Sequence, residues 1–67
     1  MTEYLDYFGA LVRVAELFDG RFVAARVNSK GSARHVKSPL LPTRESAEEA
    51  QIDLDAYAQQ RKWRRVE

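Results

Sequence analysis

The chain has 67 residues, a formal net charge of +1 and no cysteine. A chain of this length buries only about 60% of its unfolded surface, so we expect one small domain over residues 1–67, with no catalytic cavity and no enzyme activity. The absence of cysteine excludes disulfides and thiolate metal sites. The acidic N-terminus and the lack of a long apolar run predict a cytoplasmic protein with no signal peptide, membrane association, cofactor or small-molecule substrate.

Charge is unevenly distributed along the chain even though the totals almost cancel. Residues 21–44 hold six basic residues and no acidic one, whereas residues 45–57 hold five acidic residues and no basic one. The net charge therefore gives no argument for a polyanion partner, but the acid-free segment does.

Residues 1–9 contain four large apolar or aromatic residues, which is too many for a disordered tail. A short helix and an extension of the next strand are both compatible with this segment. Gly9 is expected to interrupt either structure.

The strongest local signal is a β-hairpin over about residues 10–28. Two β-rich runs flank Asp19-Gly20, a dipeptide that suits a two-residue type I′ turn. This turn would place Arg13 opposite Arg26 on one surface, while the valines of both strands share the other. The sequence thus predicts one basic and one apolar surface of the hairpin.

A second turn over residues 28–32 leads to a short third strand at about residues 33–38. Pro39 and Pro42 end strand pairing, because proline lacks the N–H that a ladder needs. The first part of the chain is therefore predicted to be an antiparallel three-stranded sheet.

A helix over about residues 44–62 is predicted to pack on that sheet, giving an α+β domain of β-β-β-α order. Thr43 stands where an N-cap is wanted, and the acidic start and basic end of the helix suit its dipole. The expected inward stripe comprises Ala47, Ala50, Leu54, Tyr57 and Ala58.

The candidate DNA contacts are the bases of the hairpin, the second turn and the third strand. They are Arg13, Arg26, Lys30, His35 and Lys37. Two arginines opposite each other on a sheet repel unless solvent or an anion separates them, which fits a phosphate-facing surface. Alternatively, these arginines extend into water or pair with helix carboxylates.

Other residue types give weaker signals. His35 has no second histidine or cysteine with which to share a metal, so no metal site is expected. The acids of the helix are either a solvated face or an imitation of nucleic-acid phosphates. Ile52 and Trp63 fall away from the inward stripe, and they either contact residues 1–9 or form a strip that binds a protein partner.

Three short segments resemble a known DNA-binding module. They are Gly20-Arg21-Phe22-Val23-Ala24, then Val36, then Thr43-Arg44-Glu45-Ser46-Ala47-Glu48-Glu49-Ala50. From about residue 19 to residue 57 the chain resembles the three-stranded-sheet-plus-helix modules of plant ethylene-response factors and the arm-binding domains of tyrosine-recombinase integrases. The resemblance implies a sheet that lies in the major groove of duplex DNA.

The resemblance also implies a strand orientation that conflicts with the hairpin register. It places Phe22 and Ala24 towards the helix and puts Val23, Ala25 and Val27 on the DNA side, where apolar residues make poor phosphate contacts. An apolar uncovered face would favour a protein partner over DNA.

Two functional hypotheses follow from the sequence. The first is a small non-catalytic module that binds duplex DNA through a basic sheet face. The alternative is a homodimeric or protein-binding adaptor that uses an apolar sheet or helix surface.

Overall fold

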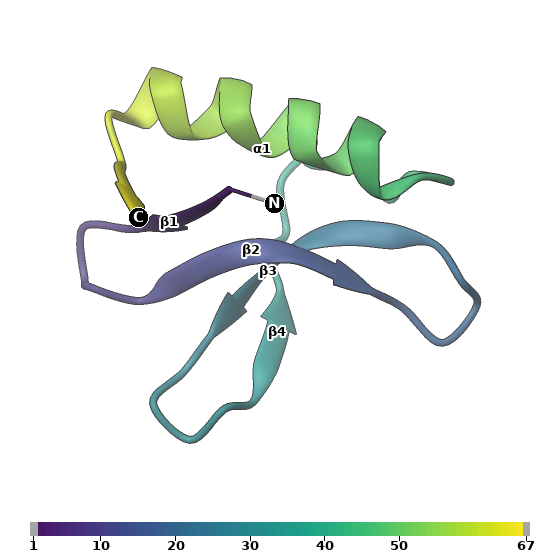
Figure 1. Cartoon of the computed structure of the whole chain (residues 1–67), viewed down its shortest axis with the longest axis horizontal. Coiled ribbons are helices and arrows are strands. Elements are labelled where there is room, and N and C mark those ends of the chain that lie inside the picture. Colours follow the sequence, from purple (N-terminus) through teal and green to yellow (C-terminus); the bar gives the residue numbers. More distant parts are fainter. Residues whose placement is uncertain (1, 67) are drawn as a thin grey trace.

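Alternating apolar residues in the first half of the chain form a twisted antiparallel sheet, and one helix lies across a single face of it (Figure 1). The computed structural model describes residues 2–66. Within them the elements are β1 Glu3–Leu5, β2 Leu11–Glu16, β3 Phe22–Val27, β4 Ala33–His35, α1 Ala47–Arg61 and β5 Arg64–Val66. The strand order in the sheet is β4-β3-β2-β1-β5.

The small α+β architecture is confirmed, but the predicted count of three strands is wrong, because the described residues form five. β1 is separate from the first strand of the hairpin and pairs with β5, with Glu3 opposite Val66. Each of these two strands has three residues. Alternation of apolar and polar residues needs a longer run to be recognised in a sequence.

The three hairpins of the sheet are closed by the same turn, over residues 6–10, 17–21 and 28–32. In each turn the first residue donates its N–H to the carbonyl of the last, over 2.7–3.0 Å, and the fourth residue donates to the carbonyl of the first, over 3.0–3.1 Å. The fourth residue is always glycine, with φ between 80° and 84°. A three-residue loop with glycine in this left-handed region is a type I turn followed by a G1 bulge.

This turn corrects the predicted hairpin register by one residue. Phe18 joins Asp19 and Gly20 in the loop, so Arg13 lies opposite Ala25 and Val12 lies opposite Arg26. A shift of one residue moves a side chain to the other face of the sheet. Arg13 and Arg26 are therefore on opposite faces, and the predicted arginine pair is not formed.

The helix begins three residues later than predicted, with Ser46 rather than Thr43 as its N-cap. The Ser46 hydroxyl accepts the N–H of Glu49 over 3.1 Å. Arg44 is unavailable to the helix because its backbone forms two 2.7 Å hydrogen bonds with Phe22, at the edge of β3. A β-bridge at Arg44 therefore sets the earliest start of α1.

The helix ends at Arg61, close to the predicted boundary. Lys62 adopts a left-handed conformation with φ of 59°, and the N–H of Trp63 reaches back to the carbonyl of Ala58 over 2.9 Å. This Schellman-type end satisfies carbonyls of the last turn and turns the chain towards β5.

The core lies between α1 and the helix-facing side of the sheet. Its members are Tyr4, Val12, Ala24, Val36, Leu41, Leu54, Tyr57 and Ala58, with Val14 and Trp63 packed against them. The predicted inward stripe of the helix is confirmed for four residues, while Ala47 is half-buried. Leu41 reaches this core from the connection between β4 and α1.

Tyr4 connects β1 to α1 through a hydrogen bond. Its hydroxyl donates to Asp55 Oδ1 over 2.7 Å, and Gln51 Nε2 donates to the same oxygen over 2.7 Å. Burial of the ring raises the pKa of the Tyr4 hydroxyl to about 12, and the neighbouring Asp55 carboxylate adds to the increase. The neutral phenol is thus the form that the fold favours.

Candidate functional site

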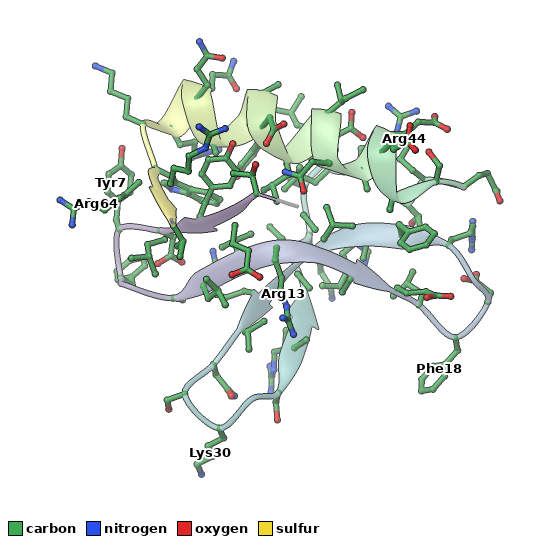
Figure 2. The ribbon with its side chains drawn as sticks, in the orientation of Figure 1. Tyr7, Arg13, Phe18, Lys30, Arg44 and Arg64 are labelled. Atoms are coloured by element: carbon green, nitrogen blue, oxygen red, sulfur yellow. The ribbon has the colours of Figure 1, made fainter. Side chains whose placement is uncertain are left out.

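The end of β3, the turn over residues 28–32 and β4 form a two-stranded ribbon that projects away from α1 (Figure 1). Lys30 lies at the tip of this ribbon, at the far side of the molecule from the helix (Figure 2). We call residues 25–37 the basic ribbon. Its basic side chains are Arg26, Lys30, Arg34 and Lys37, accompanied by His35, and it contains no acidic residue.

The bases of the basic ribbon differ in their ion pairs from those next to it. Among the described residues, Lys30, Arg34 and Lys37 form no ion pair with an acidic side chain. Arg21 and Arg44, which flank the ribbon in sequence, each contact an aspartate at 2.7 Å. The ribbon therefore presents positive charge that the described part of the chain leaves uncompensated.

The corrected register places a different arginine opposite Arg26. Arg34 of β4 is its cross-strand neighbour, and both lie on the helix-facing side of the sheet. Arg34 was not among the predicted contacts, because the register between β3 and β4 depends on the number of loop residues in the turn over residues 28–32. With three loop residues, as in the other two turns, Arg34 is in register with Arg26.

The predicted DNA contacts divide between the two faces of the sheet. Arg26 faces the helix side, whereas Arg13 and His35 belong to the same cross-strand row on the opposite side, with Ala25 between them. Arg13 Nη1 lies 3.9 Å from Glu3 Oε2. Four of the five predicted contacts are on the basic ribbon, and Arg13 is outside it.

The sheet face opposite α1, which we call the open face, has an apolar centre. Its residues include Leu5, Leu11, Arg13, Ala15, Val23, Ala25, Val27, Ala33, His35 and Arg64. Val23 and Ala25 are buried although the helix is on the other side, and Leu5, Leu11 and Val27 are half-buried. This orientation of β3 agrees with the strand orientation that the family resemblance implies, and the orientation from the two-residue turn is wrong.

Ile52 and Trp63, which the sequence offered either as a contact for residues 1–9 or as a strip for a protein partner, lie in different surroundings. Ile52 is 67% exposed on the outer side of α1. Trp63 instead packs on the core, with its ring 5.2 Å from that of Tyr57 in an edge-to-face contact. It also lies beside the turn over residues 6–10, so the chain's own N-terminal part contributes to its surroundings.

A small pocket of about 160 Å³ opens between that turn, the ribbon and the end of α1. Its aromatic walls include Phe8, Tyr57 and Trp63, and its charged groups are Asp6, Arg26 and Arg61. The Arg61 guanidinium lies 4.6 Å above the Tyr57 ring. The Tyr7 hydroxyl donates to the Arg61 carbonyl and so connects the turn to the helix end.

No protein-family model, curated protein or solved structure matches the chain. Across residues 2–66, no three histidine, aspartate or glutamate side chains form a group that could hold a metal ion. In the same residues, no helix has the length and apolar character needed to cross a membrane.

Proposed function

We propose that the protein is a small, non-catalytic, cytoplasmic module that binds duplex DNA through the basic ribbon. The observation that carries this proposal is the set of three ribbon bases, Lys30, Arg34 and Lys37, that have no ion pair among the described residues. The acids of α1 lie across the molecule from the ribbon tip (Figures 1 and 2). A polyanion can therefore approach the tip without meeting them.

The shape of the ribbon also suits DNA. The major groove of B-form DNA is about 12 Å wide and admits a two-stranded β-ribbon. Bases along the ribbon then lie close to phosphates on the groove walls, and each neutralised phosphate releases condensed counterions. The proposal moves the DNA contact from the broad sheet surface expected from the sequence to the projecting ribbon.

The test is the salt dependence of binding to a labelled duplex, measured by fluorescence anisotropy. We expect Lys30→Gln with Lys37→Gln to weaken binding and to reduce the slope of log affinity against log salt by about 1.8. Arg21→Gln with Lys62→Gln removes the same charge outside the ribbon and should leave the slope almost unchanged. Equal effects of the two variants, or no binding by the unaltered protein at low salt, would contradict the proposal.

Self-association through the open face is the second candidate. Leu5, Leu11 and Val27 form a continuous cross-strand row there, flanked by Arg64 and Ala33. The chain exposes 4970 Å², about 600 Å² more than expected for a compact monomer of this mass. A second copy of the chain would cover such a surface, since a stable interface buries about 800 Å² on each partner.

This candidate predicts a dimer in solution, which sedimentation analysis would detect from the mass. Leu11→Glu places a charge at the centre of the row and should give a monomer. Ile52→Glu introduces the same charge on the outer side of the helix and should leave the mass unchanged. A monomeric unaltered protein at high concentration would exclude self-association.

A further inference from the structure

Arg26 differs from the other aspartate-paired arginines in which of its nitrogens are used. Its Nε donates to Asp6 Oδ2 over 2.8 Å, and within residues 2–66 neither terminal nitrogen donates a hydrogen bond. Arg44, by contrast, directs Nε and Nη2 to Asp53 and Nη1 to Glu49. The terminal N–H groups of Arg26 are therefore available to donate to an oxyanion.

The hydrogen bonds of the Asp6 carboxylate do not involve the terminal nitrogens of Arg26. Its Oδ1 accepts the N–H groups of Phe8 and Ala10, each over 2.9 Å, and its Oδ2 accepts Arg26 Nε. The Asp6 side chain is only 3% exposed, whereas that of Arg26 is 46% exposed. The buried Asp6 carboxylate thus binds Nε of Arg26, and the half-exposed Arg26 side chain leaves its terminal nitrogens open to a ligand.

A second arginine lines the same pocket. Arg61 lies over the Tyr57 ring, which restricts its guanidinium to that wall. Asp6 is the only acidic residue among the described groups that line the pocket, so two arginines and one aspartate leave it with a net positive charge. Arg34 adds a further positive charge beside Arg26 across the sheet.

We propose that this pocket binds a phosphate group through the terminal nitrogens of Arg26 and the guanidinium of Arg61. Hydrogen bonds from a guanidinium to a phosphate oxygen are charge-assisted, and they are stronger than hydrogen bonds between neutral groups. The inference rests on the proposed function in one respect, since it assigns the phosphate to the backbone of the duplex on the basic ribbon. Free phosphate shares the same chemistry and is the other source.

The pocket is tested by titrating the protein with sodium phosphate while NMR follows the Nε–H signals of its arginines. Sodium chloride at equal ionic strength is the control. We expect the Arg26 and Arg61 signals to shift saturably with phosphate alone. Arg61→Gln, an exposed change that leaves the Asp6 contact in place, should weaken phosphate binding about tenfold. Arg21→Gln is the matched control and should have no effect.

Arg26→Lys gives a second variant that keeps a positive charge next to Asp6 but removes the planar fork, and it should also weaken phosphate binding. If phosphate shifts neither signal, or shifts them no more than chloride does, the pocket proposal is wrong.

Repeating the titration with duplex DNA separates the pocket from the function. Shifts with both phosphate and duplex support the proposal in full. Shifts with phosphate and no binding of duplex overturn the backbone assignment together with the proposed function, and free phosphate is then the ligand. Duplex binding that Arg61→Gln and Arg26→Lys leave unchanged overturns the pocket and leaves the proposed function standing.

Discussion

The turns over residues 6–10 and 28–32 have the same backbone geometry and opposite surroundings. Asp6 and Asn28 each accept two backbone N–H groups through one side-chain oxygen, from the residues two and four positions later. Asp6 is buried and uses its second oxygen to hold Arg26, whereas Asn28 is exposed on the ribbon. The local sequence therefore specifies the turn, and tertiary packing decides how much stability depends on it.

The largest difference between the two turns should appear when their first side chain is truncated. Asp6→Ala leaves two N–H groups without their acceptor and removes the partner of Arg26, so we expect it to lower the free energy of unfolding by about 3 kcal/mol. Asn28→Ala exposes its N–H groups to water and should cost about 0.5–1 kcal/mol. Denaturant unfolding measures both.

Asp6→Asn is the matched control for this comparison. The amide oxygen can make the same two turn contacts that Asn28 makes, so only the ion pair with Arg26 is lost. We expect this variant to recover more than half of the stability that Asp6→Ala loses. Equal losses for Asp6→Ala and Asn28→Ala would show that burial of the first turn contributes nothing.

High pH should weaken the body of the domain through Tyr4. Its pKa rises from 10.0 to about 12 in the fold, so the neutral hydroxyl is favoured when folded. This contribution is complete below pH 10 and is lost as the pH rises from 10 to 12, by up to about 2–3 kcal/mol. Denaturant unfolding across this range would show the decrease, and Tyr4→Phe should lack it. An identical decrease in both proteins would assign it to another group.

The smallest effect should be shared equally by the two turns. Gly9 and Gly31 have φ of 80° and 84°, and nothing lies within 4 Å of a Cβ placed on either of them. Gly9→Ala and Gly31→Ala should therefore each cost about 1 kcal/mol from backbone strain alone, measured by denaturant unfolding. Clearly unequal costs would mean that tertiary contacts enter at one turn.

The hairpin, the helix and most of the helix's buried stripe could be predicted because their patterns are long. The hairpin register could not be obtained from Asp19-Gly20 alone, since this dipeptide suits both a two-residue turn and the last two positions of a three-residue loop. The regular spacing of Gly9, Gly20 and Gly31 is the signal that would have found three equal turns.

The candidate site could be predicted where it depends on composition, but not where it depends on the strand register. The acid-free segment led to four ribbon residues, Arg26, Lys30, His35 and Lys37. The pairing of Arg34 with Arg26, and the separation of Arg13 from Arg26, both follow from the register. Asp6 and Arg61 are far from the ribbon in sequence, and only the fold brings them to Arg26. No local pattern indicates such a contact.

The β-bridge between Phe22 and Arg44 has a consequence for aggregation. After β4 the chain leaves the sheet to place Leu41 in the core, and it then returns to the same edge of β3. Phe22 would otherwise expose an unpaired N–H and carbonyl, which is a template for adding a strand from another molecule. By closing this edge, the bridge leaves β4 as the outer strand on that side, and its short length and flanking bases disfavour amyloid-like growth.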